Sequence, residues 1–286
     1  MRLIVGMVFA VLPAWAEWSI HYRSGEGLLA QGRAEDAIRE LKIALDEYPE
    51  GNVILDALGR AEMHSGRYRS AKRYFEKASH ASMDNAVSMG NWAEACFELG
   101  EYSSAELLLR RTLDRMPGSA DAWHLLGQIY YRSRRYSDAE SAFHKALAIS
   151  KNALVWSDLA TIYVAQHQDE KAIQMLQRAI LEGSPGQGRA RVRANLADLQ
   201  WKHGEDDAAR SGFQEAMEEM ITAVGPKHAE IAVILERYSQ VLRKSGRKAD
   251  AKQAAGRAAE IRSAFDFETN RNGFTVDWRD ARGGSR

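Results

Sequence analysis

One spacing of small residues recurs along most of the chain and restricts the folds that it can form. Gly127 is followed by Ala139 after twelve residues and by Ala146 after seven more, and this spacing occurs seven times with offsets of 34, 34, 34, 33, 37 and 42 residues. A period of this length indicates an array of supersecondary repeats. The seven sets are Gly25, Ala37, Ala44; Gly59, Ala71, Ala78; Ala93, Ala105, Thr112; Gly127, Ala139, Ala146; Ala160, Ala172, Ala179; Ala197, Ala209, Ala216; and Ser239, Ala251, Ala258.

Residues 120–151 show what one repeat contains. Apolar residues there fall three and four apart in two runs, which is the period of amphipathic helices. The runs are Trp123, Leu126, Ile129, Tyr130 and Ala139, Ala142, Phe143, Ala146, Leu147. The polar segment 133–137 between them is short, so it predicts a hairpin of two antiparallel helices. Small side chains at the repeated positions would let the two backbones approach closely.

This pattern resembles the tetratricopeptide repeat (TPR) family, whose helix-turn-helix signature is matched by Trp123, Leu126, Gly127, Tyr130, Ala139, Phe143 and Ala146. The resemblance implies an all-α fold, a right-handed superhelical solenoid of about seven units over residues 17–264, starting near 18, 52, 86, 120, 153, 190 and 232. The longer final repeats are similar to those of kinesin light chains. Residues 265–286 would be a tail, partly disordered and partly capping the last helix through Phe265, Phe267, Phe274 and Trp278.

The first sixteen residues have the layout of a signal peptide. Arg2 precedes an apolar run from Leu3 to Leu12, and Pro13 is followed by the small-residue pattern of residues 14–16. The run is shorter than the roughly 20 residues that cross a bilayer. We therefore expect cleavage after Ala16 and export, in a bacterium to the periplasm, with no membrane span in the mature chain. The alternative is a retained N-terminal helix that packs on the first repeat.

Composition argues against several classes of function. Lys and Arg together number 39, as do Asp and Glu, so no net positive charge favours a nucleic-acid partner. Cys96 is the only cysteine and is expected to be a buried apolar filler, which rules out an internal disulfide or a cysteine-built zinc site. The eight histidines lack the three- or four-residue spacing of metal pairs, and phosphate-loop or nucleophile motifs are absent. We predict no catalytic, cofactor-binding or metal site, and no cofactor.

The connections carry two further expectations. Gly32, Gly66, Gly100, Gly204 and Gly246 occupy inter-helix turns, where glycine accepts the left-handed conformation that ends a helix. Arg134 and His167 stand at the equivalent places, so we expect a different closure in those two turns. The glycine-rich segment 183–188 is interpreted as a longer connection in preference to a hinge.

The resemblance implies that the first helix of each unit lines a concave groove, whose columns can be taken from the repeat. The apolar column is Leu29, Met63, Phe97, Tyr131, Val164, Trp201 and Arg243. One turn earlier lies the polar column of Glu26, Arg60, Glu94, Gln128, Thr161, Asp198 and Gln240, and His64, Glu98, Arg132, Lys202 and Lys244 follow the apolar one. An apolar floor between polar walls suits an extended or helical peptide.

We therefore predict a peptide-binding groove formed by Met63, Phe97, Tyr131, Val164, Trp201, Arg60, Glu94, Gln128, Glu98, Arg132 and Lys202. In the alternative interpretation the apolar column is ordinary core. Arg60 with Glu94, and Glu98 with Arg132, would then be lateral salt bridges of little value at a surface. Glu94 and Glu98 share a helix face and are expected to be solvated carboxylates in preference to an acid-base pair.

Arg189, Arg191 and Arg193 open a helix at the end where cations are disfavoured, which favours an anionic partner near the sixth unit. The Lys and Asn clamp by which some family members hold a C-terminal carboxylate is not matched, so a chaperone-tail adaptor is not supported. The function expected is a non-enzymatic scaffold for a protein or peptide in envelope assembly or regulation. The alternatives are an auxiliary subunit of an envelope enzyme and a cytoplasmic adaptor. The sequence sets no oligomeric state.

Overall fold

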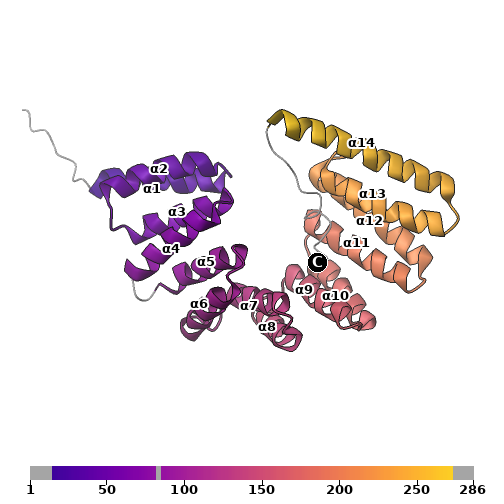
Figure 1. Cartoon of the computed structure of the whole chain (residues 1–286), viewed down its shortest axis with the longest axis horizontal. Helices are drawn as coiled ribbons and strands as arrows, with labels where there is room; N and C mark the ends of the chain where they lie inside the picture. The colour runs from indigo at the N-terminus through magenta and orange to yellow at the C-terminus, as the bar shows by residue number, and fades with distance from the viewer. Residues whose placement is uncertain (1–14, 82–84, 273–286) are drawn as a thin grey trace, which may run out of the picture. The chain divides into compact units, whose positions relative to one another are not determined.

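The computed structural model describes the backbone of residues 15–81 and 85–272 and the side chains of residues 17–80 and 85–264. The described residues form α-helices joined by short connections and contain no β-strand (Figure 1), so the predicted all-α class is confirmed. The helices are α1 (Trp15–Ala30), α2 (Ala34–Glu47), α3 (Asn52–His64), α4 (Tyr68–Ala81), α5 (Ala86–Glu98), α6 (Tyr102–Arg115), α7 (Ala120–Arg132), α8 (Tyr136–Ile149), α9 (Ala153–Ala165), α10 (Asp169–Glu182), α11 (Gln187–Lys202), α12 (Asp206–Val224), α13 (Ala229–Lys244) and α14 (Lys248–Asn272).

The chain divides into two compact units, which we call the N-terminal unit (residues 1–135) and the C-terminal unit (residues 136–286). The division falls in the turn between α7 and α8. In the N-terminal unit each helix contacts the next, and α1, α3, α5 and α7 also contact one another in that order. In the C-terminal unit α11 likewise contacts both α9 and α13. We call the surface formed by these odd-numbered helices, taken within each unit, the first-helix face.

The repeated small residues lie where the predicted hairpins require them. Ala37, Ala71, Ala105 and their equivalents are fully buried. A Cβ atom on Gly25 would lie 2.6 Å from Leu41 Cγ, and one on Gly59 would lie 2.4 Å from Phe75 Cε1. In the first two hairpins the helices are therefore closer than any larger residue at Gly25 or Gly59 would allow, which is the packing expected from the spacing.

The seven turns that join the two helices of a repeat all close in the same way. The expectation of a different closure at Arg134 and His167 is therefore wrong. Both residues adopt the left-handed conformation, with φ of 59° and 57°, as Gly32 does with φ of 73°. The Arg134 N–H donates to Tyr131 O at 2.9 Å and the following N–H donates to Tyr130 O at 2.8 Å. These hydrogen bonds satisfy carbonyls at the helix end. The stabilisation that they provide outweighs the steric cost of a side chain at positive φ.

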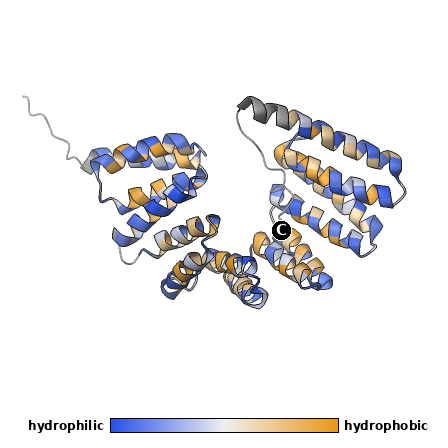
Figure 2. Ribbon diagram, viewed as in Figure 1, coloured by the Kyte–Doolittle hydropathy of each residue, from blue (hydrophilic) through white to orange (hydrophobic). Residues whose placement is uncertain are grey.

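The C-terminal unit contains the longer helices that the wider repeat spacing predicts. Helix α12 has 19 residues, whereas α10 has 14. Helix α13 contacts both α12 and α14, and ten of its residues are buried; Figure 2 shows apolar residues concentrated along it. The likeness of these repeats to kinesin light chains stays a prediction.

The glycine-rich segment between α10 and α11 joins two helices that touch each other. This contact fits the interpretation of the segment as a longer connection. Gly186 has a φ of 147° and donates its N–H to Glu219 Oε1 at 2.9 Å, so the start of α11 is held by a side chain from α12.

Two predictions fall largely outside the described residues. The apolar run and the cleavage pattern at residues 14–16 lie in or beside residues 1–14. Helix α14 continues to Asn272, eight residues past the expected end of the solenoid at Ala264. The side chains of Phe265, Phe267, Phe274 and Trp278 are outside the described part, so their capping role stays a prediction.

Candidate functional site

The apolar column of the first-helix face is neither a closed core nor a bare surface. Leu29 is buried and Val164 is exposed, while Met63, Phe97, Tyr131 and Trp201 are half-buried. Each of these four keeps part of its side chain accessible to solvent in its own unit. The sequence places them at equivalent positions near the ends of α3, α5, α7 and α11, as the repeat predicts.

The buried parts of Met63, Phe97 and Trp201 contact neighbouring helices. Met63 packs against the buried cluster of Ala71, Phe75 and Ala95. The Phe97 ring lies 5.7 Å from the Tyr102 ring between centroids, in a tilted arrangement. Trp201 packs against the core of the C-terminal unit, and Lys244 Nζ lies 4.6 Å from its ring centroid. The column therefore has a packed side and a solvent-accessible side, and its role as a peptide-binding groove stays a prediction.

The polar column of α1 and α3 is already paired within the chain. Arg60 Nη2 donates to Glu26 Oε1 at 2.6 Å, and Arg60 Nε donates to Asp56 Oδ2 at 3.2 Å. Asp56 Oδ1 also accepts from Ser88 Oγ at 2.9 Å and from Asn91 Nδ2 at 3.1 Å. These bonds link α1, α3 and α5 laterally. The lateral pair suggested between Arg60 and Glu94 is not the one formed.

Glu94 lies in a different electrostatic setting, on α5. Its side chain is exposed by its accessible area, yet surrounding atoms still desolvate the carboxyl, and Glu98 and Asp121 add negative charge; together they raise its pKa, against the smaller effect of His64. Neither Glu94 nor Glu98 forms an ion pair among the described residues. Both carboxylates are exposed, as expected, but Asp121 as a third member of the group was not predicted.

The arginines at the start of α11 have partners inside the chain, so the expectation that they favour an external anion is wrong. Arg189 Nε donates to Glu219 Oε1 at 2.6 Å, and Arg193 Nε donates to Glu219 Oε2 at 2.9 Å. Arg191 Nε donates to Glu230 Oε2 at 2.7 Å. Burial alone would raise the pKa of the Glu219 carboxyl, but the Gly186 N–H and the two guanidinium groups lower it overall.

In the C-terminal unit, too, part of the polar column is paired within the chain. Asp198 pairs with Arg237, which additionally donates to Ala194 O at 3.2 Å and Asn195 Oδ1 at 3.0 Å. Lys202 on α11 and Lys244 on α13 are exposed. The first-helix face of this unit thus presents Trp201 beside lysines, whereas that of the N-terminal unit presents Phe97 beside carboxylates.

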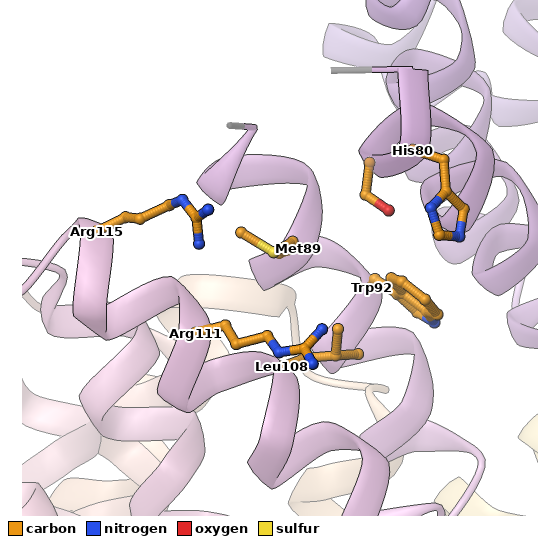
Figure 3. Close-up of a pocket in the computed structure, with 7 residues that line it drawn as sticks. His80, Met89, Trp92, Leu108, Arg111 and Arg115 are labelled. Atoms are coloured by element: carbon orange, nitrogen blue, oxygen red, sulfur yellow. The ribbon is translucent and has the colours of Figure 1, made fainter. Parts of the chain in front are cut away.

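A separate hollow of about 300 Å³ lies between α4, α5 and α6 (Figure 3). Its apolar wall is formed by Met89, Trp92 and Leu108, and the side chains of Arg111 and Arg115 extend from α6 toward Met89 and Leu108. None of the predicted groove residues lines it. Its walls come from three helices of two repeats, so no pattern within a single helix predicts it.

Cys96 is a buried free thiol, and desolvation raises its pKa to about 11, as suits an apolar filler. Among the described residues no group of three His, Cys, Asp or Glu side chains is arranged to hold a metal ion. No helix in the described ranges is both long and apolar enough to cross a membrane.

Comparisons with known proteins place the chain among repeat proteins. Three family models described as tetratricopeptide repeats match residues 22–86, 62–129 and 120–153. Tetratricopeptide repeat protein 21B of Xenopus laevis is 23% identical in an alignment 257 residues long, which covers 76% of this chain but 19% of that protein. The chain therefore spans less than a fifth of the length of this relative.

Two solved structures share the fold. A tetratricopeptide repeat protein from Parabacteroides merdae is similar with a TM-score of 0.64 at 18% identity, over 86% of this chain and 93% of that one. The pilF protein of Pseudomonas aeruginosa is similar with a TM-score of 0.62 at 19% identity, over 75% and 96%. With the repeated small residues, the uniform left-handed turns and the family matches together, this chain is a tetratricopeptide-repeat protein, and such repeats form protein-interaction scaffolds.

Proposed function

We propose that this protein is a non-enzymatic scaffold that holds a segment of another protein against the first-helix face. The observation that carries the proposal is the half-buried column of Met63, Phe97, Tyr131 and Trp201. Half-buried aromatic rings on rigid helices supply contact area at little entropic cost, and interface hot spots are enriched in such residues. The polar residues beside the column would set the register of the bound segment.

The setting that we propose is the bacterial envelope, with the protein exported and acting in assembly or regulation of envelope proteins. The apolar run of residues 3–12 and the small residues before Glu17 support this part. Mass spectrometry of the protein purified from its native host should show Glu17 at the N-terminus. Mature protein that retains Met1 would count against export and leave the scaffold proposal standing.

Binding and folding can be separated by comparing aromatic residues of the two kinds. Phe97 and Trp201 are half-buried on first helices, whereas Phe143 on α8 is 1% exposed. Phe143→Ala should cost about 3–5 kcal/mol of stability, as for other buried aromatics. Phe97→Ala and Trp201→Ala should cost clearly less, because part of each ring already contacts solvent.

The binding assay starts from peptides selected on the full chain from a random displayed library. The strongest peptide is then titrated against the wild-type protein, Phe97→Ala and Trp201→Ala. Loss of a contact residue of the hot-spot kind should weaken binding by about 1 kcal/mol or more. Selected peptides whose affinities are the same for all three proteins would refute the proposed face, as would unfolding of Phe97→Ala as severe as that of Phe143→Ala.

A further inference from the structure

The charges on the first-helix face of the N-terminal unit are not balanced evenly from helix to helix. Glu26 and Arg60, at equivalent positions of α1 and α3, are joined at 2.6 Å. Arg60 is held in addition by Asp56, so these charges have internal partners. The next equivalent position, Glu94 on α5, breaks this pattern of pairing, since it is another acidic residue, is exposed and forms no ion pair among the described residues.

Three carboxylates gather at that break. Glu98 lies one turn after Glu94 on α5, and Asp121 lies in the first turn of α7, the next first helix. None of the three forms an ion pair among the described residues, and their mutual repulsion adds to desolvation in raising the pKa of Glu94. His64 on α3 is the group that opposes this, and Arg132 at the end of α7 is not among the charges that act on Glu94.

The same place carries an aromatic surface. Phe97 is half-buried and stands three residues after Glu94 and directly before Glu98. Met63, at the equivalent position of α3, is half-buried as well. An aromatic ring beside carboxylates suits the two parts of a lysine or arginine side chain, because the methylene stem covers the ring while the charged head reaches the carboxylates.

We propose that the segment bound by the N-terminal unit carries a lysine or arginine that lies over Phe97 between Glu94 and Glu98. This inference rests on the proposed function and specifies the chemistry of its partner. The partner's cation would supply the counter-charge that α1 and α3 supply to each other, and it would relieve the repulsion among Glu94, Glu98 and Asp121. Such complementarity speeds association and makes affinity depend on salt.

The probe is the strongest peptide selected on the full chain from the random displayed library, together with a copy in which every Lys and Arg is replaced by Gln. We expect the selected peptides to be enriched in Lys or Arg next to a bulky apolar residue. The Gln copy should bind about tenfold more weakly or worse, and a NaCl increase from about 0.1 M to about 1 M, which cuts the Debye length from about 10 Å to about 3 Å, should weaken the basic peptide far more than its copy.

The matched variants are the double change Glu94→Gln with Glu98→Gln, and the control Asp114→Asn on α6. Glu94, Glu98 and Asp114 are all exposed and without ion pairs among the described residues. Asp114, however, lies on the second helix of its repeat and so outside the first-helix face. The double variant should keep the wild-type melting temperature or exceed it, since a repulsion is removed. It should bind the basic peptide about tenfold more weakly, while the control binds normally.

The outcomes separate this inference from the proposed function. If Phe97→Ala weakens binding and the double variant does not, the face binds peptides but the basic partner is wrong. If neither change matters, both proposals fall. Selected peptides that are acidic or uncharged, and that depend on Phe97, would also overturn the inference while supporting the face.

Discussion

The contact between Gly59 and Phe75 allows the repeat packing to be tested with one methyl group. A Cβ on Gly59 would lie 2.4, 2.6 and 2.8 Å from Cε1, Cδ1 and Cζ of Phe75. That ring is 1% exposed, so it has no space into which to turn. Gly59→Ala should therefore force a shift in the hairpin, and overpacking of this kind costs about 1–3 kcal/mol. Against this cost, replacing a glycine inside a helix by alanine stabilises the helix by about 0.5–1 kcal/mol.

Gly90→Ala is the matched control, because it makes the same change inside a first helix where space is available. The nearest atom to a Cβ there is Thr112 Cγ2 at 3.8 Å, an ordinary contact. This variant should become more stable by about 0.5–1 kcal/mol. Both variants share the stabilisation of the helix by alanine. The difference between their unfolding free energies is therefore the cost of overpacking, about 1–3 kcal/mol.

The assay is guanidinium unfolding followed by far-ultraviolet circular dichroism on the wild type and the two variants. A second comparison adds Phe75→Leu, which removes the ring, alone and together with Gly59→Ala. The combined change should be less destabilising than the sum of the single ones by at least about 0.5 kcal/mol. Equal shifts for Gly59→Ala and Gly90→Ala would refute the close approach of the two helices in this repeat.

Three further predictions follow from the turns, the α11 carboxylate and the buried thiol. Arg134→Gly and His167→Gly should each leave stability unchanged or raise it by about 1 kcal/mol in denaturant titrations, since the left-handed conformation strains a side chain but not glycine; a clear loss in both would contradict this. Because the folded pKa of Glu219 is lowered, its stabilisation is present at neutral pH and is lost as the pH falls below its unfolded value of about 4.3. Glu219→Gln should thus cost about 1.5–3 kcal/mol at pH 7 and much less at pH 3, and equal costs at both pH values would exclude the linkage. Cys96 should react with a thiol reagent only after denaturant is added, and rapid labelling of the native protein would show that the helix is open.

The repeat could be predicted closely because its signal is local and periodic. The first helices were expected near residues 18, 52, 86, 120, 153, 190 and 232, and they begin at 15, 52, 86, 120, 153, 187 and 229. Small residues at a fixed spacing are required wherever two helix backbones meet, so they mark every hairpin. The turns at Arg134 and His167 were mispredicted because propensity was weighed alone, although the hydrogen bonds at the helix end are the same with or without glycine.

The charges were harder to predict because their partners are distant in sequence. Arg193 and Glu219 are 26 residues apart, and Arg191 and Glu230 are 39 apart. Analysis of first helices alone cannot reveal that α12 supplies a carboxylate to the start of α11. The half-buried state of Phe97 and Trp201 has a related cause, since it depends on how near the following helix lies, and a single column of residues does not encode that distance.

The pairing of the α11 arginines also bears on how an array like this one is shortened or extended in evolution and in design. Removal of the first repeat would take Glu26 from Arg60 and Glu35 from Arg67, but each arginine would keep a carboxylate of its own repeat, Asp56 or Glu62.

At the other end the situation differs. Among the described residues the ion pairs of Arg191 are with Glu230 alone, and Glu230 belongs to the last repeat. Deletion of that repeat would strand a guanidinium group at the positive end of α11 and uncover buried residues of α11 and α12 that the last repeat covers. Removal of the first repeat would also uncover buried residues, those of α3 that pack against it, so the two ends differ in their ion pairs. Among the described residues, an arginine loses all its carboxylate partners only when the last repeat is deleted, and that end of the array is therefore the costlier one to shorten.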